Sequence, residues 1–253
     1  MKAGCPENNY INLSESNLSS EHLSCIIRSR KIHQGVENKR AWLDNRLKEG
    51  HVFRKLDIKK AVFIEYAPLE TAWVPISGEN YYYIYCLWCT QKGMGYAKSL
   101  ITYCIEDAKA NGKSGICMLG SLKQKAWLSN QAFAKKYGFE VVDRTASGYE
   151  VLALSFDGKK AYFNENAKKE TITNQDLTIY FDAQCPYTYD KIRLIKEYCG
   201  LKNIALSLIQ VSSLEMAKEL PCAFNNWALF YKGKFITVNL LDVSAIEKIL
   251  KKY

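Results

Sequence analysis

A short glycine turn between a predicted strand and a predicted helix is the part of the sequence best suited to chemistry. Residues 91–96 (Gln-Lys-Gly-Met-Gly-Tyr) follow an aromatic run at residues 81–89 and precede apolar residues at helical spacing. Gly93 and Gly95 let the backbone direct several N–H groups into one concavity, and the following helix directs its positive end there. This combination favours a bound phosphate or pyrophosphate. A tight turn without a ligand would use the same two glycines, so the pattern alone leaves both interpretations open.

A second candidate for chemistry is the thiol of Cys185. Residues 184–188 (Gln-Cys-Pro-Tyr-Thr) follow a predicted strand and begin a predicted helix, and Pro186 suits a first helical turn because it needs no N–H partner. A helix N-terminus stabilises a thiolate, so we expect Cys185 to have a lowered pKa and to be nucleophilic. The segment begins like the glutaredoxin-type motif Cys-Pro-Tyr-Cys, but Thr188 replaces its second cysteine. Monothiol chemistry, pairing with a distant thiol such as Cys222 and the lack of a redox role all stay open.

The elements that must position these residues fall into two groups. Up to residue 156 we predict helices at 23–47, after residue 95 and at 130–137, with strands at 52–56, 61–66, 81–89, 116–119, 139–142 and 149–156. From residue 177 the order is strand, helix, strand, short helix, strand, strand, helix, which is the minimal thioredoxin-like order. Between them, residues 158–176 are rich in Lys, Asn and Glu and predict a linker. We therefore expect domains at 1–157 and 177–253.

Composition bounds the class of protein. A length of 253 residues favours two domains, and 48% hydrophobic with 24% charged residues is typical of globular chains. We find no apolar run long enough to span a membrane and no apolar segment typical of a signal peptide at the N-terminus. Nine cysteines, an odd number, favour free thiols in a reducing cytoplasm. The net charge of +9 is spread along the chain without a basic block, so we expect neither a nucleic-acid nor a membrane partner. The spacing of His and Cys predicts no metal site.

Several segments resemble one superfamily of enzymes. The turn at 91–96 is similar to the pyrophosphate loop of the GNAT N-acetyltransferases, Gln/Arg-x-x-Gly-x-Gly/Ala, with Gly93 and Gly95 matching and Thr90 departing at the first position. Residues 132–139 (Ala-Phe-Ala-Lys-Lys-Tyr-Gly-Phe) resemble the helix that ends in Gly-Phe in that superfamily. Residues 63–76 and 224–235 resemble a subgroup in which a YoaP-like domain follows the GNAT domain. The resemblance implies an α/β (α+β) protein, with a mixed, splayed central sheet followed by a small thioredoxin-like domain.

The resemblance also implies a co-substrate and a place for it. In the GNAT fold, acetyl-CoA lies where two neighbouring strands splay apart, and an amine attacks its thioester directly. The strand before the loop would bind the pantetheine arm, and the loop amides would bind the pyrophosphate. The residues implied in acetyl-CoA binding are Leu87, Trp88, Cys89, Gln91, Lys92, Gly93, Met94, Gly95 and Tyr96.

The acid and the base of the reaction are harder to assign. GNAT enzymes often protonate the leaving thiolate with a tyrosine four residues before the glycine of the Gly-Phe pair, and that position here is Ala134. Tyr137, Ser121 or water could take its place. Glu65 and Glu70 precede the cleft strand and are candidate bases, although carboxylates on strands are more often solvent-exposed or paired with a cation.

We therefore expect a cytoplasmic N-acetyltransferase that moves an acetyl group from acetyl-CoA to an amine of a small molecule or peptide. Two other classes stay open: a monothiol redox or thiol-binding protein acting through Cys185, and an acyl-CoA-binding module without turnover. The complete glycine turn favours the first. The acceptor and the oligomeric state do not follow from the sequence.

Overall fold

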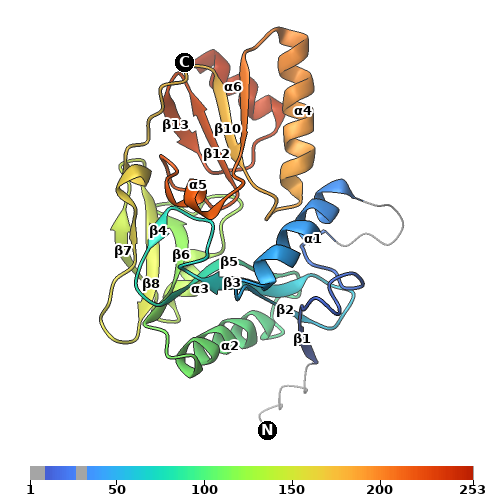
Figure 1. Cartoon of the computed structure of the whole chain (residues 1–253), viewed down its shortest axis with the longest axis vertical. Coiled ribbons are helices and arrows are strands. Elements are labelled where there is room, and N and C mark those ends of the chain that lie inside the picture. Colours follow the sequence, from blue (N-terminus) through green and yellow to red (C-terminus); the bar gives the residue numbers. More distant parts are fainter. Residues whose placement is uncertain (1–8, 27–32, 253) are drawn as a thin grey trace.

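The structure is a computed structural model that describes residues 9–26 and 33–252. A seven-stranded sheet occupies the first part of the chain, in the order β1-β2-β3-β5-β6-β8-β7 (Figure 1). Its strands are β1 (Tyr10–Asn12), β2 (Val52–Leu56), β3 (Val62–Pro68), β5 (Tyr81–Cys89), β6 (Gly115–Ser121), β7 (Glu140–Arg144) and β8 (Tyr149–Ser155). β5 and β6 are parallel, and the other neighbours are antiparallel. The sheet is therefore mixed, as the sequence predicted.

Helices cover both faces of this sheet because side chains alternate along its central strands. Val62 and Ile64 of β3 face one side, where they pack with Leu100 of α2 (Tyr96–Ala110). Phe63 faces the other side, which is covered by α1 (Gln34–Leu47) and the C-terminal domain. Figure 1 shows α2 below the sheet and α1 above it. A short helix, α3 (Gln131–Lys135), follows β6.

The sheet splays open between β5 and β6. These strands pair only over the first four residues of β5, from Tyr81 with Gly115 to Ile84 with Met118. Beyond that point β6 pairs with β8 alone and β5 pairs with β3 alone. A register shift against β3 leaves Tyr85 as an extra residue at the point of divergence, and such a bulge bends a strand. The second half of β5 thus turns an open edge towards the gap, which confirms the predicted splay.

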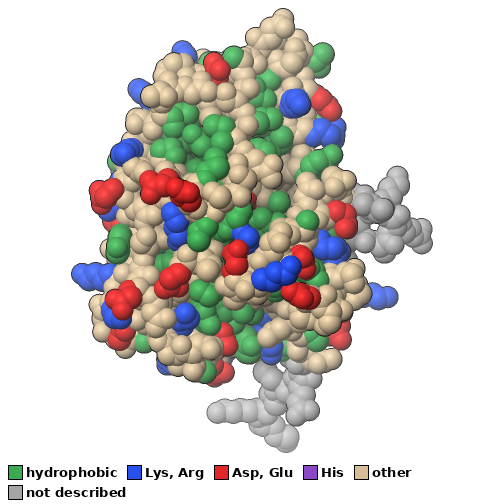
Figure 2. All heavy atoms as spheres, viewed as in Figure 1, with side chains coloured by type: hydrophobic (Ala, Val, Ile, Leu, Met, Phe, Trp, Pro, Cys, Tyr) green, Lys and Arg blue, Asp and Glu red, His purple; other side chains and the backbone are tan. Residues whose placement is uncertain are grey.

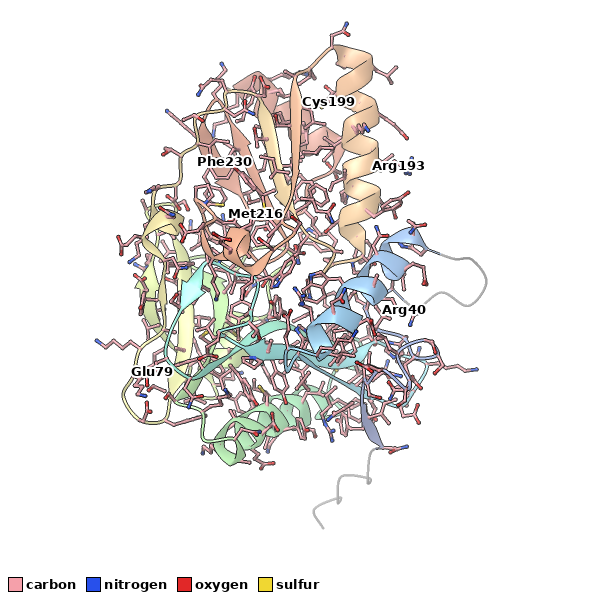
Figure 3. All side chains as sticks on the ribbon, in the orientation of Figure 1. Arg40, Glu79, Arg193, Cys199, Met216 and Phe230 are labelled. Carbon is pink, nitrogen blue, oxygen red and sulfur yellow. The ribbon has the colours of Figure 1, made fainter. Side chains whose placement is uncertain are left out.

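The C-terminal domain has a four-stranded sheet in the order β11-β10-β12-β13. Its elements are β10 (Leu177–Phe181), α4 (Tyr187–Lys202), β11 (Leu206–Gln210), α5 (Leu214–Lys218), β12 (Trp227–Tyr231), β13 (Lys234–Thr237) and α6 (Val243–Lys252). This is the element order predicted from the sequence; the thioredoxin-like classification stays a prediction. α4 and α6 pack on one face, and α5 packs on the other, where Met216 and Phe230 belong to one apolar cluster (Figure 3).

Two sequence predictions differ from the structure. Residues 158–176 are more than a linker, because β9 (Tyr162–Phe163) pairs with β4 (Ile76–Ser77) and a 3₁₀ turn follows at Glu165–Lys168. The predicted helix at 23–47 was too long: Leu23 and Ile26 lie in a buried, non-helical segment, and α1 begins only at Gln34. Residues 27–32 of that prediction lie outside the described part. The domain boundaries themselves stay a prediction.

The surface carries charges of both signs. Figure 2 shows Lys and Arg side chains interspersed with Asp and Glu over the face in view. Among the helices that the structure describes, none is both long enough and apolar enough to cross a membrane.

Candidate active site

A cavity of about 790 Å³ runs from the glycine turn to the C-terminal domain. Its walls come from β3, the open half of β5, α1, the segment before α3 and the loops at residues 184–186 and 225–226. Both domains therefore enclose it, and it lies along the open edge of β5.

The predicted acetyl-CoA residues lie at one end of this cavity. Leu87, Trp88, Cys89 and Lys92 line it, and the rest of the turn continues outwards to α2. Gly93 and Gly95 have φ values of 78° and 75°, a conformation that glycine adopts without strain. Gln91, Met94 and Tyr96 complete the turn at the N-terminus of α2, whose first N–H groups have no partner inside the helix. The geometry suits a pyrophosphate.

A serine that the sequence analysis missed contacts the open edge of β5. The Leu87 N–H donates a hydrogen bond to Ser129 Oγ at 3.1 Å, and both residues line the cavity. Ser129 lies just before α3 in a loop without a recognisable motif, so only the fold brings it to β5. The Leu87 N–H is thus placed where it could bind an acyl oxygen in exchange for the serine.

The carboxylate of Glu65 lies deeper in the cavity and is fully buried. Its Oε2 accepts hydrogen bonds from Lys39 Nζ at 2.6 Å and from Gln184 Nε2 at 2.8 Å. Its Oε1 accepts one from His51 Nε2 at 3.1 Å. These donors come from α1, the start of β2 and the C-terminal domain, so three segments hold one carboxylate.

Electrostatics keep this carboxylate ionised. Burial alone would raise the pKa of Glu65, but the Lys39 ammonium and the His51 hydrogen bond outweigh it and hold the pKa below its ordinary value. Burial lowers the pKa of His51 despite the nearby carboxylate, so the imidazole is neutral and its N–H is the donor. A carboxylate has about four acceptor positions, and three are used, which leaves room for a cationic ligand.

The C-terminal domain completes this arrangement through side-chain amides. Gln184 Oε1 accepts a hydrogen bond from Asn226 Nδ2 at 3.0 Å while its Nε2 donates to Glu65. Asn225 accepts one from the Tyr83 hydroxyl at 2.7 Å and donates to the Tyr85 carbonyl. The second domain therefore contributes both to the cavity wall and to the support of the carboxylate.

Three of the predicted catalytic residues lie outside the cavity. Glu70 is exposed in the turn after β3, where its Oε1 accepts a hydrogen bond from the Asn80 N–H at 2.8 Å. Tyr137 packs against Phe133, with ring centroids 4.9 Å apart. The buried Ser121 hydroxyl donates to the Lys123 carbonyl. Only Glu65 among the four predicted residues lines the cavity, and the other three have local structural partners.

The structure differs from the sequence prediction of a lowered pKa for Cys185. Burial raises the pKa of the Cys185 thiol to about 12, whereas the sequence predicted a lowered pKa. Desolvation of the thiolate outweighs the helix N-terminus because Cys185, half-buried, lies where both domains meet. Cys222 is buried among residues on the α5 face of the C-terminal sheet, whereas Cys185 packs on the opposite face. Thr188 is buried, and in the described residues its hydroxyl has no hydrogen-bond partner.

Comparisons with known proteins identify the family of this chain. A family model described as YoaP-like matches residues 206–251. Over 245 residues the chain is 34% identical to the "Uncharacterized N-acetyltransferase YoaP" of Bacillus subtilis strain 168, covering 95% of this chain and 98% of that protein. The chain belongs to the YoaP-like N-acetyltransferases. This YoaP-like acetyltransferase is therefore an enzyme, which confirms that prediction.

Solved structures resemble the YoaP-like acetyltransferase only distantly. One is a GNAT family acetyltransferase from Brucella melitensis in complex with acetyl-CoA, at 12% identity and a TM-score of 0.39 over 62% of this chain and 92% of that chain. Another is the PaiA N-acetyltransferase of Thermoplasma acidophilum in complex with coenzyme A, at 15% identity and a TM-score of 0.41 over 58% and 99%.

Proposed function

We propose that this enzyme acetylates a primary amine of a small molecule or peptide, and that the amine reaches the thioester from the side of Glu65. The observation that carries the proposal is the single cavity that joins the open edge of β5 to this buried carboxylate. The second candidate, a thiol-redox protein, is not favoured, because the pKa of Cys185 is raised and its candidate partner lies on the other face of the sheet.

Acetyl-CoA enters this scheme along β5. The amides at 91–96 and the N-terminus of α2 hold the pyrophosphate, and the open backbone of Leu87–Cys89 holds the pantetheine arm. The thioester carbonyl oxygen then replaces Ser129 Oγ as the acceptor of the hydrogen bond that the Leu87 N–H donates. A backbone N–H is a fixed donor, so it stabilises the oxyanion that forms when the amine attacks.

The role proposed for Glu65 is electrostatic. Because its pKa is held low, it is a weak base but a permanent anion next to the reacting nitrogen. Attack forms the N–C bond and places a positive charge on nitrogen while negative charge moves to the carbonyl oxygen. An ionised carboxylate that is itself buried stabilises that cation.

The reaction is complete when a proton moves from nitrogen to sulfur. Collapse of the intermediate breaks the C–S bond, and the thiolate of coenzyme A needs the proton that the nitrogen must lose. The Ser129 hydroxyl, once released from Leu87, can accept a proton from nitrogen and donate its own to sulfur. The products are the N-acetylated amine and free coenzyme A, without any other reactant.

The proposal is tested with Glu65→Gln and a matched control, Glu70→Gln, whose carboxylate lies outside the cavity. With acetyl-CoA and a panel of amines, Glu65→Gln should lower kcat/KM by roughly 10²–10³, a range typical of lost electrostatic stabilisation. The loss should be equal from pH 6 to pH 9, because the carboxylate is ionised throughout. A loss confined to low pH would instead assign Glu65 as the base, and an unchanged rate would remove it from the reaction.

The cytoplasm remains the proposed compartment, since the nine cysteines favour a reducing environment. The acceptor is proposed only as a class, a small molecule or peptide with a free amine. The 1–157 and 177–253 boundaries are kept as the proposed domains.

A further inference from the structure

A second cavity, of about 620 Å³, lies between α1 and the C-terminal domain. One wall is a face of α1 that includes Gly35 and Trp42, and Trp73 adjoins it. The opposite wall comprises the ends of the parallel strands β10 and β11 and the first turn of α4. The glycine turn at 91–96 does not line it, and the second cavity adjoins the first at Cys185, which lines both. Ligands often bind at the carboxyl ends of parallel strands.

Four buried polar groups in the walls of this cavity have no hydrogen-bond partner in the described part of the chain. They are Asp182 Oδ2, Thr188 Oγ1, Trp42 Nε1 and Trp73 Nε1. Asp182 and Thr188 are each 2% exposed, and the two tryptophans are each 8% exposed. Buried polar atoms in proteins are nearly always paired, so four unpaired ones around one cavity indicate a site that a polar ligand fills.

The chemistry of these groups indicates what kind of ligand fits. Asp182 offers a carboxylate oxygen, which binds a cationic N–H donor best. The two indole N–H groups and the Thr188 hydroxyl offer three donors, which suit a carboxylate or carbonyl. The Arg46 guanidinium lies 4.2 Å from the centre of the Trp73 ring and adds positive charge near these donors. The site therefore combines one acceptor carboxylate with three donors and a nearby cation.

The rest of the cavity is apolar. Phe181, Ile192 and Val211 line it beside the polar groups. Its volume falls in the range of roughly 300–1,000 Å³ that small-molecule sites occupy. A ligand that fits must combine an ammonium, a carboxylate and an apolar body.

We propose that this cavity binds a free α-amino acid with an apolar side chain. The ammonium pairs with Asp182, the carboxylate accepts hydrogen bonds from Trp42, Trp73 and Thr188, and the side chain packs on Phe181 and Val211. This site is separate from the proposed reaction and does not depend on it.

The test is isothermal titration of the full-length protein with L-leucine in the absence of acetyl-CoA. We expect saturable binding of L-leucine. N-acetyl-L-leucine and L-leucinamide should each bind with at least tenfold lower affinity, because the first lacks the ammonium and the second lacks the carboxylate. Asp182→Asn should weaken leucine at least tenfold. Trp42→Phe, which removes one N–H, should weaken it a few-fold. Glu215→Gln, an exposed change on α5, should leave the affinity unchanged.

Circular dichroism checks that each variant is folded. Two further variants, Thr188→Val and Trp73→Phe, each remove a single donor and replace any variant that does not fold. Absence of saturable binding for leucine, isoleucine, valine, methionine and phenylalanine would overturn the proposal. Equal affinity for leucine and leucinamide would also overturn it. Leucine binding that depends on Glu65 and not on Asp182 would overturn it too, because the ligand would then lie in the first cavity.

Discussion

Replacing Asp182 by asparagine should make the protein more stable at neutral and alkaline pH. The gain in stability should be smaller in acid. Burial raises the pKa of this carboxyl from 3.8 to about 7, while its Oδ1 accepts a hydrogen bond from the Gln184 N–H that asparagine can also accept. A carboxyl whose pKa is higher in the folded state binds more protons there than in the unfolded chain. Folding is then disfavoured as pH rises through the window between the two pKa values.

The size of the effect follows from those two values. A difference of about three pKa units, at about 1.4 kcal/mol for each, gives roughly 4 kcal/mol. The stability of Asp182→Asn relative to the native protein should therefore increase from about pH 4 to pH 7 and stay constant above it. The slope should not exceed about 1.4 kcal/mol per pH unit. Other ionisable groups cancel in the comparison, because both proteins contain them.

The measurement is urea unfolding of both proteins at pH values from 4.5 to 8.5, without added amino acids. Glu215→Gln, an exposed carboxylate on α5, is the control and should give a difference near zero throughout. A difference between Asp182→Asn and the native protein that does not vary with pH would refute the reasoning. It would mean that the buried carboxylate has a cation partner in the folded protein.

Four further predictions test other parts of the structure. Gly95→Val should weaken acetyl-CoA binding at least tenfold by calorimetry because of its positive φ in the loop, whereas Gly158→Val, also at positive φ but outside the cavity, should not. Gln184→Leu removes a donor to Glu65 and should cost about 1–3 kcal/mol of stability by urea unfolding and lower kcat/KM; equal values to the native enzyme would contradict the role of the amide. Cys185 should react with iodoacetamide at pH 7.5 at least tenfold more slowly than free cysteine, since its pKa of about 12 leaves little thiolate, and labelling as fast as free cysteine would contradict that. Gly35→Ala should cost about 1–3 kcal/mol because a Cβ there would lie 2.0 Å from the Pro186 carbonyl oxygen, whereas Gly200→Ala, on the open side of α4, should stabilise the helix by about 0.5–1 kcal/mol.

Local patterns in the sequence predicted local structure well. The glycine turn lies between a strand and a helix because an aromatic run without Gly or Pro precedes it and apolar residues at helical spacing follow it. The order of elements after residue 177 could also be predicted, because turn residues such as Asn203 and Gly233 separate its elements. The helix at 23–47 failed at its start, where Leu23 and Ile26 are buried by the rest of the fold without being helical.

The residues around Glu65 could not be predicted, because they meet only through long-range contacts. Lys39 is 26 residues away and Gln184 is 119 residues away, and neither belongs to a motif for binding a carboxylate. Long-range contacts also explain why the predicted direction of the Cys185 pKa shift was wrong. The local rule for a thiol at a helix N-terminus was applied correctly, but it assumes exposure, and docking of the two domains removes the water that a thiolate needs.

The contribution of Gln184, Asn225 and Asn226 to the first cavity has a consequence for the order of events during synthesis. The glycine turn, the splayed strands and Glu65 leave the ribosome long before these amides do, and domains fold from the N-terminus onwards as they emerge. When the residues of the N-terminal sheet have emerged, one wall of the reaction chamber has yet to be translated. Catalysis would then begin only when the last third of the polypeptide has docked, so an incomplete chain would not consume acetyl-CoA.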